Sequence, residues 1–219
     1  MKFRVVSYYT RKTIYEAIMV NYLLPCLEIL QIPNAIYSVD NTGNWENNAS
    51  FQPSMIWRAL KTWPDQAIVW MDSDVIVRDY PILFEEIPSR CDVGLYYMQY
   101  SDHYNANPPH GIEMPKPILT TGVIWFNNSP KTLALVEEWM ERIAKDPKKS
   151  YRLHFTELIN SRLIDSLSFF LIPREYAYIA EKDDGSIPAI PMKNPIICQF
   201  QASAYAKKDL YDTKPFLGI

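Results

Sequence analysis

The sequence predicts an α/β protein in which helices flank a mostly parallel central sheet, with a small antiparallel portion late in the chain. Two observations support this class. Short runs rich in β-branched and aromatic residues alternate with segments of helical periodicity, the order expected for parallel strands joined by crossover helices. The third such run, AIVWM (67–71), is followed at once by two carboxylates, Asp72 and Asp74. Polar side chains at a strand's carboxyl end are typical of ligand sites in such sheets.

The first half of the chain supplies the alternation. Residues 13–30 carry apolar side chains at helical spacing, with a kink or break expected at Pro25. The polar stretch 40–50 is expected to be a loop, and 51–63 a helix with Pro53 in its first turn. Three short apolar runs are predicted as strands, at 3–9, 34–39 and 67–71.

The second half is expected to continue with a short helix at 80–87 and a helix at 131–145, which Ser129-Pro130 opens. A further helix is expected at 153–163. Residues 100–117 are polar, proline-rich and without periodicity, which favours a lid or acceptor loop. Strands are predicted at 92–98, 118–128, 166–173, 177–180 and 194–200.

Composition limits the class of protein. The 219 residues, 48% hydrophobic and 21% charged, suit one globular domain, taken as 1–219 because no linker or repeat interrupts it. A formal net charge of −3 gives no support to a broad nucleic-acid surface. Three distant cysteines in apolar surroundings are expected to be reduced. With no signal-peptide pattern and no apolar run long enough to cross a membrane, a cytoplasmic location is expected.

The aspartate pair is the strongest chemical signal. Two carboxylates beside an apolar run repel one another and are costly to desolvate unless something neutralises them. Mg²⁺ or Mn²⁺ would do so, since hard cations prefer oxygen ligands and often share them with phosphates. The alternative is a capped loop in which Asp72 and Asp74 are simply solvated.

A second chemistry fits the same residues. In haloacid-dehalogenase-like phosphatases, Asp72 would be the nucleophile and Asp74 the general acid. Residues 118–121 would then form the threonine-ended strand, and Asp183-Asp184 the late acidic motif. This alternative ranks second, because two β-α units precede Asp72 and no apolar strand leads to Asp183.

Most of the chain resembles a small GT-A-type glycosyltransferase, a Rossmann-like fold, of the nucleotide-diphospho-sugar transferase group with a D-x-D strand. The order and spacing of several segments carry the resemblance. These are Thr13, Tyr15 and Glu16 after the first strand, Trp45-Glu46, Phe51 with Pro53, VWMDSDVIV, LTTGVIWFNNS (119–129), an acidic helix residue at Glu157, LIPREYAYI (171–179) and IICQFQAS (196–203).

The resemblance implies a metal-dependent enzyme that moves a hexose or pentose from a nucleotide-sugar donor, with UDP favoured and retention of the anomeric centre expected. Asp72 and Asp74 would hold a metal that bridges the phosphates, and Glu157 would face the sugar or acceptor. The remaining donor contacts would come from Ser7, Tyr8, Tyr9 and Thr10 at the nucleotide, Thr120, Thr121 and Gly122 near the sugar, and Lys207 and Lys208 at the diphosphate.

Two positions depart from the family pattern. Gln52 stands where the family often has Lys, and Gln199 where it often has a His that ligates the metal. Because a Gln carbonyl ligates Mg²⁺ or Mn²⁺ more weakly, a third hypothesis is a degenerate nucleotide- or glycan-binding module. The acceptor is left open among a glycan, a protein side chain and a modified nucleobase.

Overall fold

The computed structural model describes residues 2–98, 118–161, 166–180 and 192–200. Its centre is a six-stranded sheet in the order β2-β1-β3-β8-β5-β9. Neighbouring strands run parallel except at β8, which is antiparallel to both β3 and β5. The mostly parallel sheet is therefore confirmed. The strands span Phe3–Thr10 (β1), Asn34–Val39 (β2), Ala67–Met71 (β3), Val93–Leu95 (β5), Val123–Phe126 (β8) and Phe169–Leu171 (β9).

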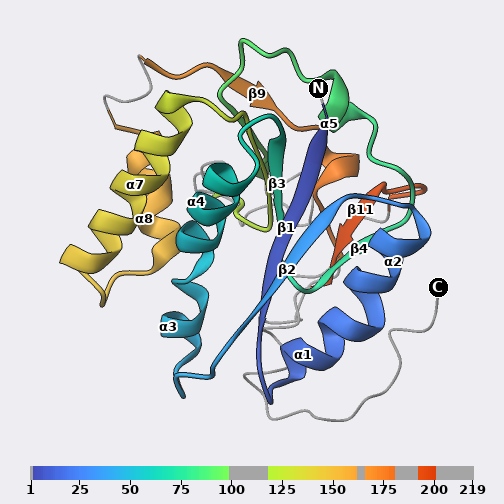
Figure 1. Cartoon of the computed structure of the whole chain (residues 1–219), viewed down its shortest axis with the longest axis horizontal. Coiled ribbons are helices and arrows are strands. Elements are labelled where there is room, and N and C mark those ends of the chain that lie inside the picture. Colours follow the sequence, from blue (N-terminus) through green and yellow to red (C-terminus); the bar gives the residue numbers. More distant parts are fainter. Residues whose placement is uncertain (1, 99–117, 162–165, 181–191, 201–219) are drawn as a thin grey trace, which may run out of the picture.

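Helices cover both faces of this sheet (Figure 1). On one face, α4, α7 and α8 pack against alternate strand residues such as Val6, Ile68 and Trp70. On the other face, the helical run from α1 to α2 packs on Val5 and Val69. This two-sided burial explains why β3 is apolar throughout. The helices are Ile14–Ile18 (α1), Leu24–Ile29 (α2), Gln52–Thr62 (α4), Pro130–Lys145 (α7) and Tyr151–Ile159 (α8).

A second, three-stranded sheet lies on the α1–α2 side. Its order is β10-β11-β4, with β11 parallel to β10 and antiparallel to β4. This confirms the expected late antiparallel portion, although β4 comes from the segment just after the aspartates and had not been expected as a separate strand. The strands span Val75–Val77 (β4), Tyr178–Ile179 (β10) and Ile197–Gln199 (β11).

The first helical segment runs through Pro25 without breaking. A π-helical turn, Met19–Leu23 (η1), joins α1 to α2, and the Leu24 N–H bonds to the Met19 carbonyl, five residues back. Pro25 has no N–H to give to the preceding turn, and a wider π turn just before it accommodates that loss. Thr13 caps the start of α1, where its hydroxyl accepts a hydrogen bond from the Tyr15 N–H at 3.2 Å.

Several predicted elements differ in detail. The loop expected at 40–50 contains a short helix, Trp45–Ala49 (α3), because the Asn44 side chain caps it by accepting from the Asn47 N–H at 3.0 Å. The strand expected at 92–98 is two strands, β5 and Tyr97–Met98 (β6), and that at 118–128 is Ile118–Leu119 (β7) and β8. The interruption at 120–122 places backbone groups at the site described below. The short helix at 80–87 is confirmed as Leu83–Glu86 (α5).

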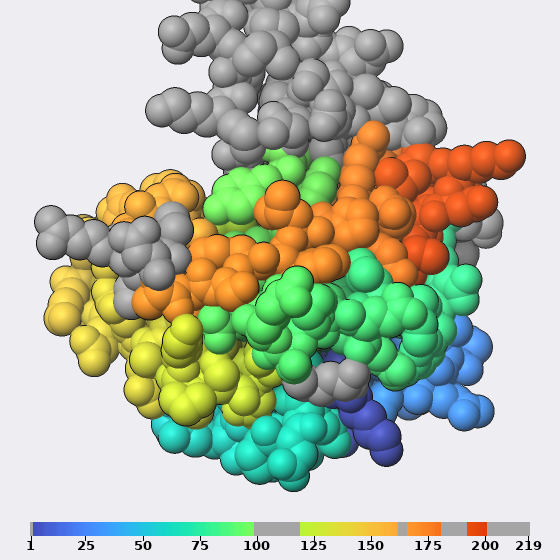
Figure 2. All heavy atoms as spheres, turned by 90° about the horizontal axis from the view of Figure 1, so that it is seen from above, coloured from blue at the N-terminus to red at the C-terminus, as the bar shows by residue number. Residues whose placement is uncertain are grey.

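The edge of the sheet at which β1 begins is closed by packing. Figure 2 views it, with residues of the segment around α5 in green beside the segment that contains β9 and the turn Arg174–Tyr176 (η3) in orange. Phe84 and Tyr176 meet edge to face at 5.5 Å between ring centroids. The Trp125 indole donates to the Phe84 carbonyl at 3.2 Å.

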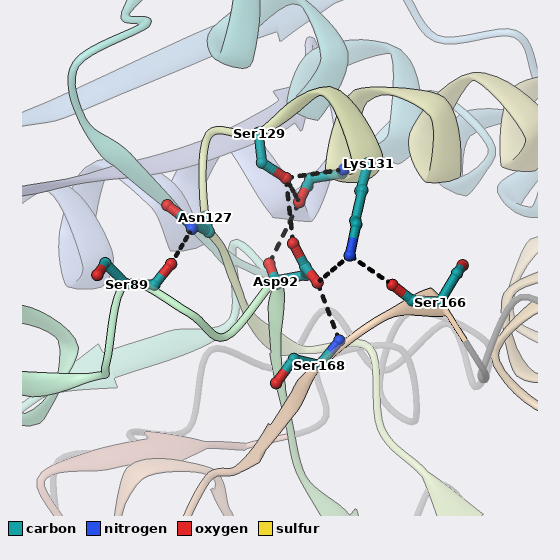
Figure 3. Close-up of polar contacts among 8 residues, drawn as sticks. Ser89, Asp92, Asn127, Ser129, Lys131, Ser166 and Ser168 are labelled. Atoms are coloured by element: carbon teal, nitrogen blue, oxygen red, sulfur yellow. Dashed lines mark hydrogen bonds and ion pairs between the residues drawn. The ribbon is translucent and has the colours of Figure 1, made fainter.

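A buried carboxylate, Asp92, ties four segments together at this same edge (Figure 3). Its side chain accepts from the Ser168 N–H at 2.9 Å and the Ser129 hydroxyl at 3.2 Å. Its backbone carbonyl accepts from the Asn127 N–H at 2.9 Å and the Thr132 hydroxyl at 3.3 Å. The network fixes β5, the end of β8, the start of α7 and the segment before β9 relative to one another. These hydrogen bonds compensate the buried Asp92 carboxylate for the water that it has lost.

The structure bears on two sequence expectations, the free cysteines and the lack of a membrane-spanning segment. Cys91 and Cys198 are buried, Cys26 is partly buried, and all three are free thiols. Within the described ranges, every helix is too short or too polar to cross a membrane.

Candidate active site

Asp72 and Asp74 lie where the chain leaves one sheet and enters another. The Asp72 N–H bonds to the Gly122 carbonyl at 2.9 Å, one step beyond the β3–β8 ladder. After Asp74 the chain becomes β4 of the small sheet, and the Asp74 carbonyl accepts from the Phe200 N–H at 3.2 Å. The apolar residues on the two sides of the pair thus belong to two sheets, and the carboxylates occupy the turn between them.

Hydrogen bonds from two described side chains hold the two carboxylates. The Trp70 indole N–H donates to Asp72 Oδ1 at 2.9 Å. The Gln199 side-chain amide donates to Asp72 Oδ2 at 3.1 Å and to Asp74 Oδ1 at 3.2 Å. Gln199 ends β11, directly opposite Val75 at the start of β4. Residues far apart in sequence thereby converge on the turn.

Burial and the neighbouring carboxylate raise the pKa of Asp72 to about 7. Desolvation is the larger cause, and the charge of Asp74 adds to it. Hydrogen bonds from Trp70 and Gln199 and the charge of Arg152 act in the opposite direction. Near neutral pH the pair therefore carries fewer than two full negative charges unless a cation joins it.

Gly122 has a packing role at this turn. A Cβ built on Gly122 would overlap the terminal amide of Gln199, so the amide lies directly over the Gly122 backbone. The neighbouring Thr121 carbonyl accepts from the buried Gln52 amide at 3.1 Å. Gln52 thus fixes the backbone beside the aspartates. Its predicted contact with a donor stays a prediction.

Three tyrosines surround the aspartates. Burial is the largest cause that raises the pKa of Tyr8, Tyr15 and Tyr151, and the charges of Asp72 or Asp74 add to it. For Tyr151 the value is about 12. All three phenols stay protonated at physiological pH and act as neutral hydrogen-bond donors or acceptors.

The aromatic neighbours of these tyrosines come from α3 and β3. The Tyr8 hydroxyl donates to the Asn48 carbonyl at 2.6 Å, and its ring lies 5.7 Å from that of Trp70. The Trp45 indole donates to the Tyr15 hydroxyl at 2.9 Å. The short helix α3, which the sequence did not predict, therefore builds one wall beside the end of β1.

The other residues predicted at the end of β1 are placed differently. Ser7 is fully buried, and no described residue pairs with its hydroxyl. The half-buried Tyr9 packs against the core cluster on the α1–α2 side of the sheet. The Thr10 carbonyl accepts from the Thr13 hydroxyl at 2.7 Å. Among these residues, only Tyr8 has contacts that connect it to the aspartate pair.

Further predicted site residues are not joined to the pair by a described contact. Glu157 is exposed on α8 and forms an ion pair with Lys149, which is the main cause that lowers its pKa. Thr120 is buried and bonds to the Tyr96 carbonyl through its N–H at 3.1 Å. Lys207, Lys208, Asp183-Asp184 and the segment 100–117 lie outside the described residues. The catalytic role of Glu157 stays a prediction.

Sequence reasoning missed three contributors. Tyr15 is expected only as part of the family resemblance. Its place shortly after a parallel strand is a usable signal, because such positions return to the same sheet edge. Trp70 lies inside the strand, where the apolar pattern predicts a core residue. Nothing in the sequence marks Tyr151, whose position depends on how α8 packs against the sheet.

The oxygen atoms at this turn are suitable ligands for a hard divalent cation. Two carboxylate oxygens, Asp72 Oδ2 and Asp74 Oδ1, lie within 3.2 Å of one point, the Gln199 terminal amide. In the described part of the chain, no three His, Cys, Asp or Glu side chains group together as metal ligands. A cation here would therefore take two carboxylates and an amide oxygen from the protein. Waters or substrate oxygens would complete its shell, as is usual for Mg²⁺.

Comparison with known proteins places this geometry in context. No family model matches the sequence, and no curated protein matches it. Solved structures do match. A glycosyltransferase involved in glycosylation of the major capsid of PBCV-1 superposes with a TM-score of 0.58 at 13% identity, covering 82% of this chain and 85% of that one. The chain has a GT-A-type fold.

Two further solved structures agree. Mouse xyloside xylosyltransferase 1 gives a TM-score of 0.53 at 11% identity, covering 93% of this chain and 99% of that chain. The galactosyltransferase LgtC, solved with donor and acceptor sugar analogues, gives 0.52 at 8% identity, covering 90% and 87%. At such identities the likeness establishes the fold. These fold matches do not favour the phosphatase alternative.

Proposed function

We propose that this protein transfers a sugar from a nucleotide-diphospho-sugar, UDP-linked in the first instance, to an acceptor. The observation that carries the proposal is the carboxylate pair Asp72 and Asp74 at the carboxyl end of β3 in a GT-A-type sheet, with both side chains directed to one point. Ligand sites of open α/β sheets lie at this edge.

Mg²⁺ or Mn²⁺ is the proposed cofactor, held by Asp72, Asp74 and Gln199. When bound, it would supply Lewis-acid stabilisation of the charge that develops on the departing diphosphate. The chain's own residues orient the site: the Trp70 indole fixes the rotation of the Asp72 carboxylate, and Gln52 fixes the Thr121 carbonyl beside it.

The neutral phenols suit recognition of a polar, uncharged partner. Tyr8, Tyr15 and Tyr151 keep their protons, and Tyr8 stacks at a tilt near Trp70 beside the end of β1. Aromatic faces and hydroxyl groups bind sugar rings and bases without adding charge. We therefore assign the base and sugar of the donor to this side. Retention of the anomeric centre is the expected outcome, and the acceptor class is a glycan, a protein side chain or a modified nucleobase.

Ligand-induced stabilisation tests the proposal. UDP, GDP, CDP and TDP are each added with and without Mn²⁺, and the melting temperature is compared with that of Asp72→Ala and Asp74→Ala. A ligand at about 100 times its Kd adds roughly 2.7 kcal/mol to the free energy of unfolding. We expect one nucleoside diphosphate to stabilise the parent only with metal, and neither variant to respond. Folded parent protein that responds to no nucleotide would refute the donor site.

A second candidate is a binding module without turnover. Gln52 and Gln199 favour it, because both are neutral where the resemblance has a cation and a stronger metal ligand. Release of UDP from UDP-sugars separates the two functions. The transferase releases UDP at a rate that depends on metal, and NMR of the product reports its anomeric configuration. The module binds UDP with metal and releases nothing.

A further inference from the structure

The Gln199 amide occupies the place between the two aspartates. Its Nε2 donates to Asp72 Oδ2 at 3.1 Å and to Asp74 Oδ1 at 3.2 Å. A primary amide nitrogen carries two hydrogens, so one is available for each carboxylate. Because Gln199 is buried, these bonds are shielded from water. The amide nitrogen thus satisfies both acceptors at the point where a cation would also satisfy them.

The oxygen end of the same amide is differently placed. Among the residues that the structure describes, none donates a hydrogen bond to Gln199 Oε1. The whole amide lies over Gly122, where any side chain would overlap it. Since amide oxygen and nitrogen have similar size, a half-turn about the last side-chain bond needs no further space. The half-turn would therefore break no hydrogen bond that a described residue donates to Gln199 Oε1.

The distances are compatible with an octahedrally coordinated cation. In an octahedral site with metal–oxygen bonds of about 2.1 Å, neighbouring oxygens lie about 3.0 Å apart, which is the bond length multiplied by the square root of two. The Gln199 amide lies 3.1 and 3.2 Å from its two carboxylate oxygens. After a half-turn, Oε1 would stand at this ligand spacing.

We propose that Gln199 is a two-position residue: its amide nitrogen bridges Asp72 and Asp74 in the cation-free protein, and a half-turn presents its oxygen as the third protein ligand to a Mg²⁺-sized cation. This rests on the metal-dependent function proposed above. The cation must first displace the two amide hydrogen bonds, which lowers its affinity. Gly122 is the residue that leaves room for both positions.

NMR of the side-chain amides observes the turn directly. Protein labelled with ¹⁵N-glutamine is titrated with Mg²⁺, and the Gln199 NH₂ signals are assigned by their loss in Gln199→Leu. We expect slow hydrogen exchange without Mg²⁺, and a shifted, faster-exchanging pair at saturation. The Gln66 amide, whose oxygen accepts from Arg4 near the opposite end of β3, serves as the reference that does not respond. Unchanged Gln199 signals with Mg²⁺ shown to be bound would overturn the proposal.

Metal affinity of two opposed variants gives a second readout. Mn²⁺ binding is followed by water-proton relaxation, which detects weak sites. Gln199→Leu removes the ligand oxygen and should weaken Mn²⁺ binding. Gln199→Glu adds a third carboxylate and should tighten it about tenfold, because affinity follows ligand charge. Tighter binding by Gln199→Leu would mean that the amide only blocks the site, and would overturn the proposal. Gln66→Leu is the matched control, expected to bind Mn²⁺ like the parent.

The two proposals fail separately. Adding UDP to each titration tests the donor site at the same time. Metal-linked UDP binding with silent Gln199 signals overturns the two-position residue and leaves the transferase standing. If the Gln199 signals respond to Mg²⁺ but no nucleoside diphosphate binds, the two-position residue stands and the transferase proposal is overturned. Should Gln199→Leu fail to fold, Gln199→Glu folded in Mn²⁺ and unstable after its removal would still support the proposal.

Discussion

Replacing Gly122 by alanine tests the packing of the site with a single methyl group. The added Cβ would overlap the Gln199 amide, which must then leave its place between Asp72 and Asp74. Two hydrogen bonds to carboxylates are lost, each worth about 1.5 kcal/mol at the low end for charged acceptors. Reduced freedom of the unfolded chain returns about 0.5 kcal/mol. We expect Gly122→Ala to lower the free energy of unfolding by about 2.5 kcal/mol.

The assay is urea denaturation without divalent cation, in a double-mutant cycle with Gln199→Ala. Gly122 is outside the left-handed backbone region, so alanine brings no conformational strain that would confuse the result. With the amide already removed, the methyl has room, and Gly122→Ala should cost less than about 0.5 kcal/mol in that background. A Gly122→Ala protein as stable as the parent, or an equal cost in both backgrounds, would refute the reasoning.

Three further predictions use other parts of the molecule. Because the folded-state pKa of Asp72 is raised to about 7, its contribution to stability is present at low pH and is lost as pH rises from about 4 towards about 7. The free energy of unfolding of the cation-free parent should therefore be lower at pH 8 than at pH 5 by at most about 2.7 kcal/mol, which is two pKa units. Asp72→Asn should flatten this profile. Asp92→Ala leaves the Ser168 N–H unpaired in the network opposite the site, and should cost about 3 kcal/mol while Mn²⁺ affinity stays unchanged; altered affinity would contradict the separation of the two edges. Glu157→Gln at an exposed ion pair should change stability by less than about 0.5 kcal/mol, and full transfer activity in this variant would remove Glu157 from the catalytic set.

Elements with strong periodicity could be predicted from the sequence because their pattern is local. Residues 67–71 are apolar because both faces of β3 are covered, and 130–145 form a helix that Ser129 caps. The break at 120–122 could not be predicted, since the Thr120 N–H bonds to the Tyr96 carbonyl across the fold. That the segment after the aspartates forms a separate strand of a second sheet could not be predicted either, because its partner, β11, lies over a hundred residues away.

The candidate site shows the same division. Asp72 and Asp74 could be found because carboxylates after an apolar strand are locally unusual. The position of Gln199 could be expected only through resemblance, and the direction of its amide depends on the packing against Gly122. Tyr151 comes to the site through tertiary packing of α8, for which the sequence has no local sign.

The turn between the two sheets has a mechanical consequence. Asp72 belongs to the end of the central sheet, whereas Asp74 leads into β4, which β11 joins to the small sheet. A cation held by both carboxylates and by Gln199 would act as a crosslink between these two bodies. The small sheet could then no longer detach by itself, and force or denaturant would have to break the molecule in one step. Binding of the cation would thus raise the cooperativity of unfolding in addition to supporting catalysis.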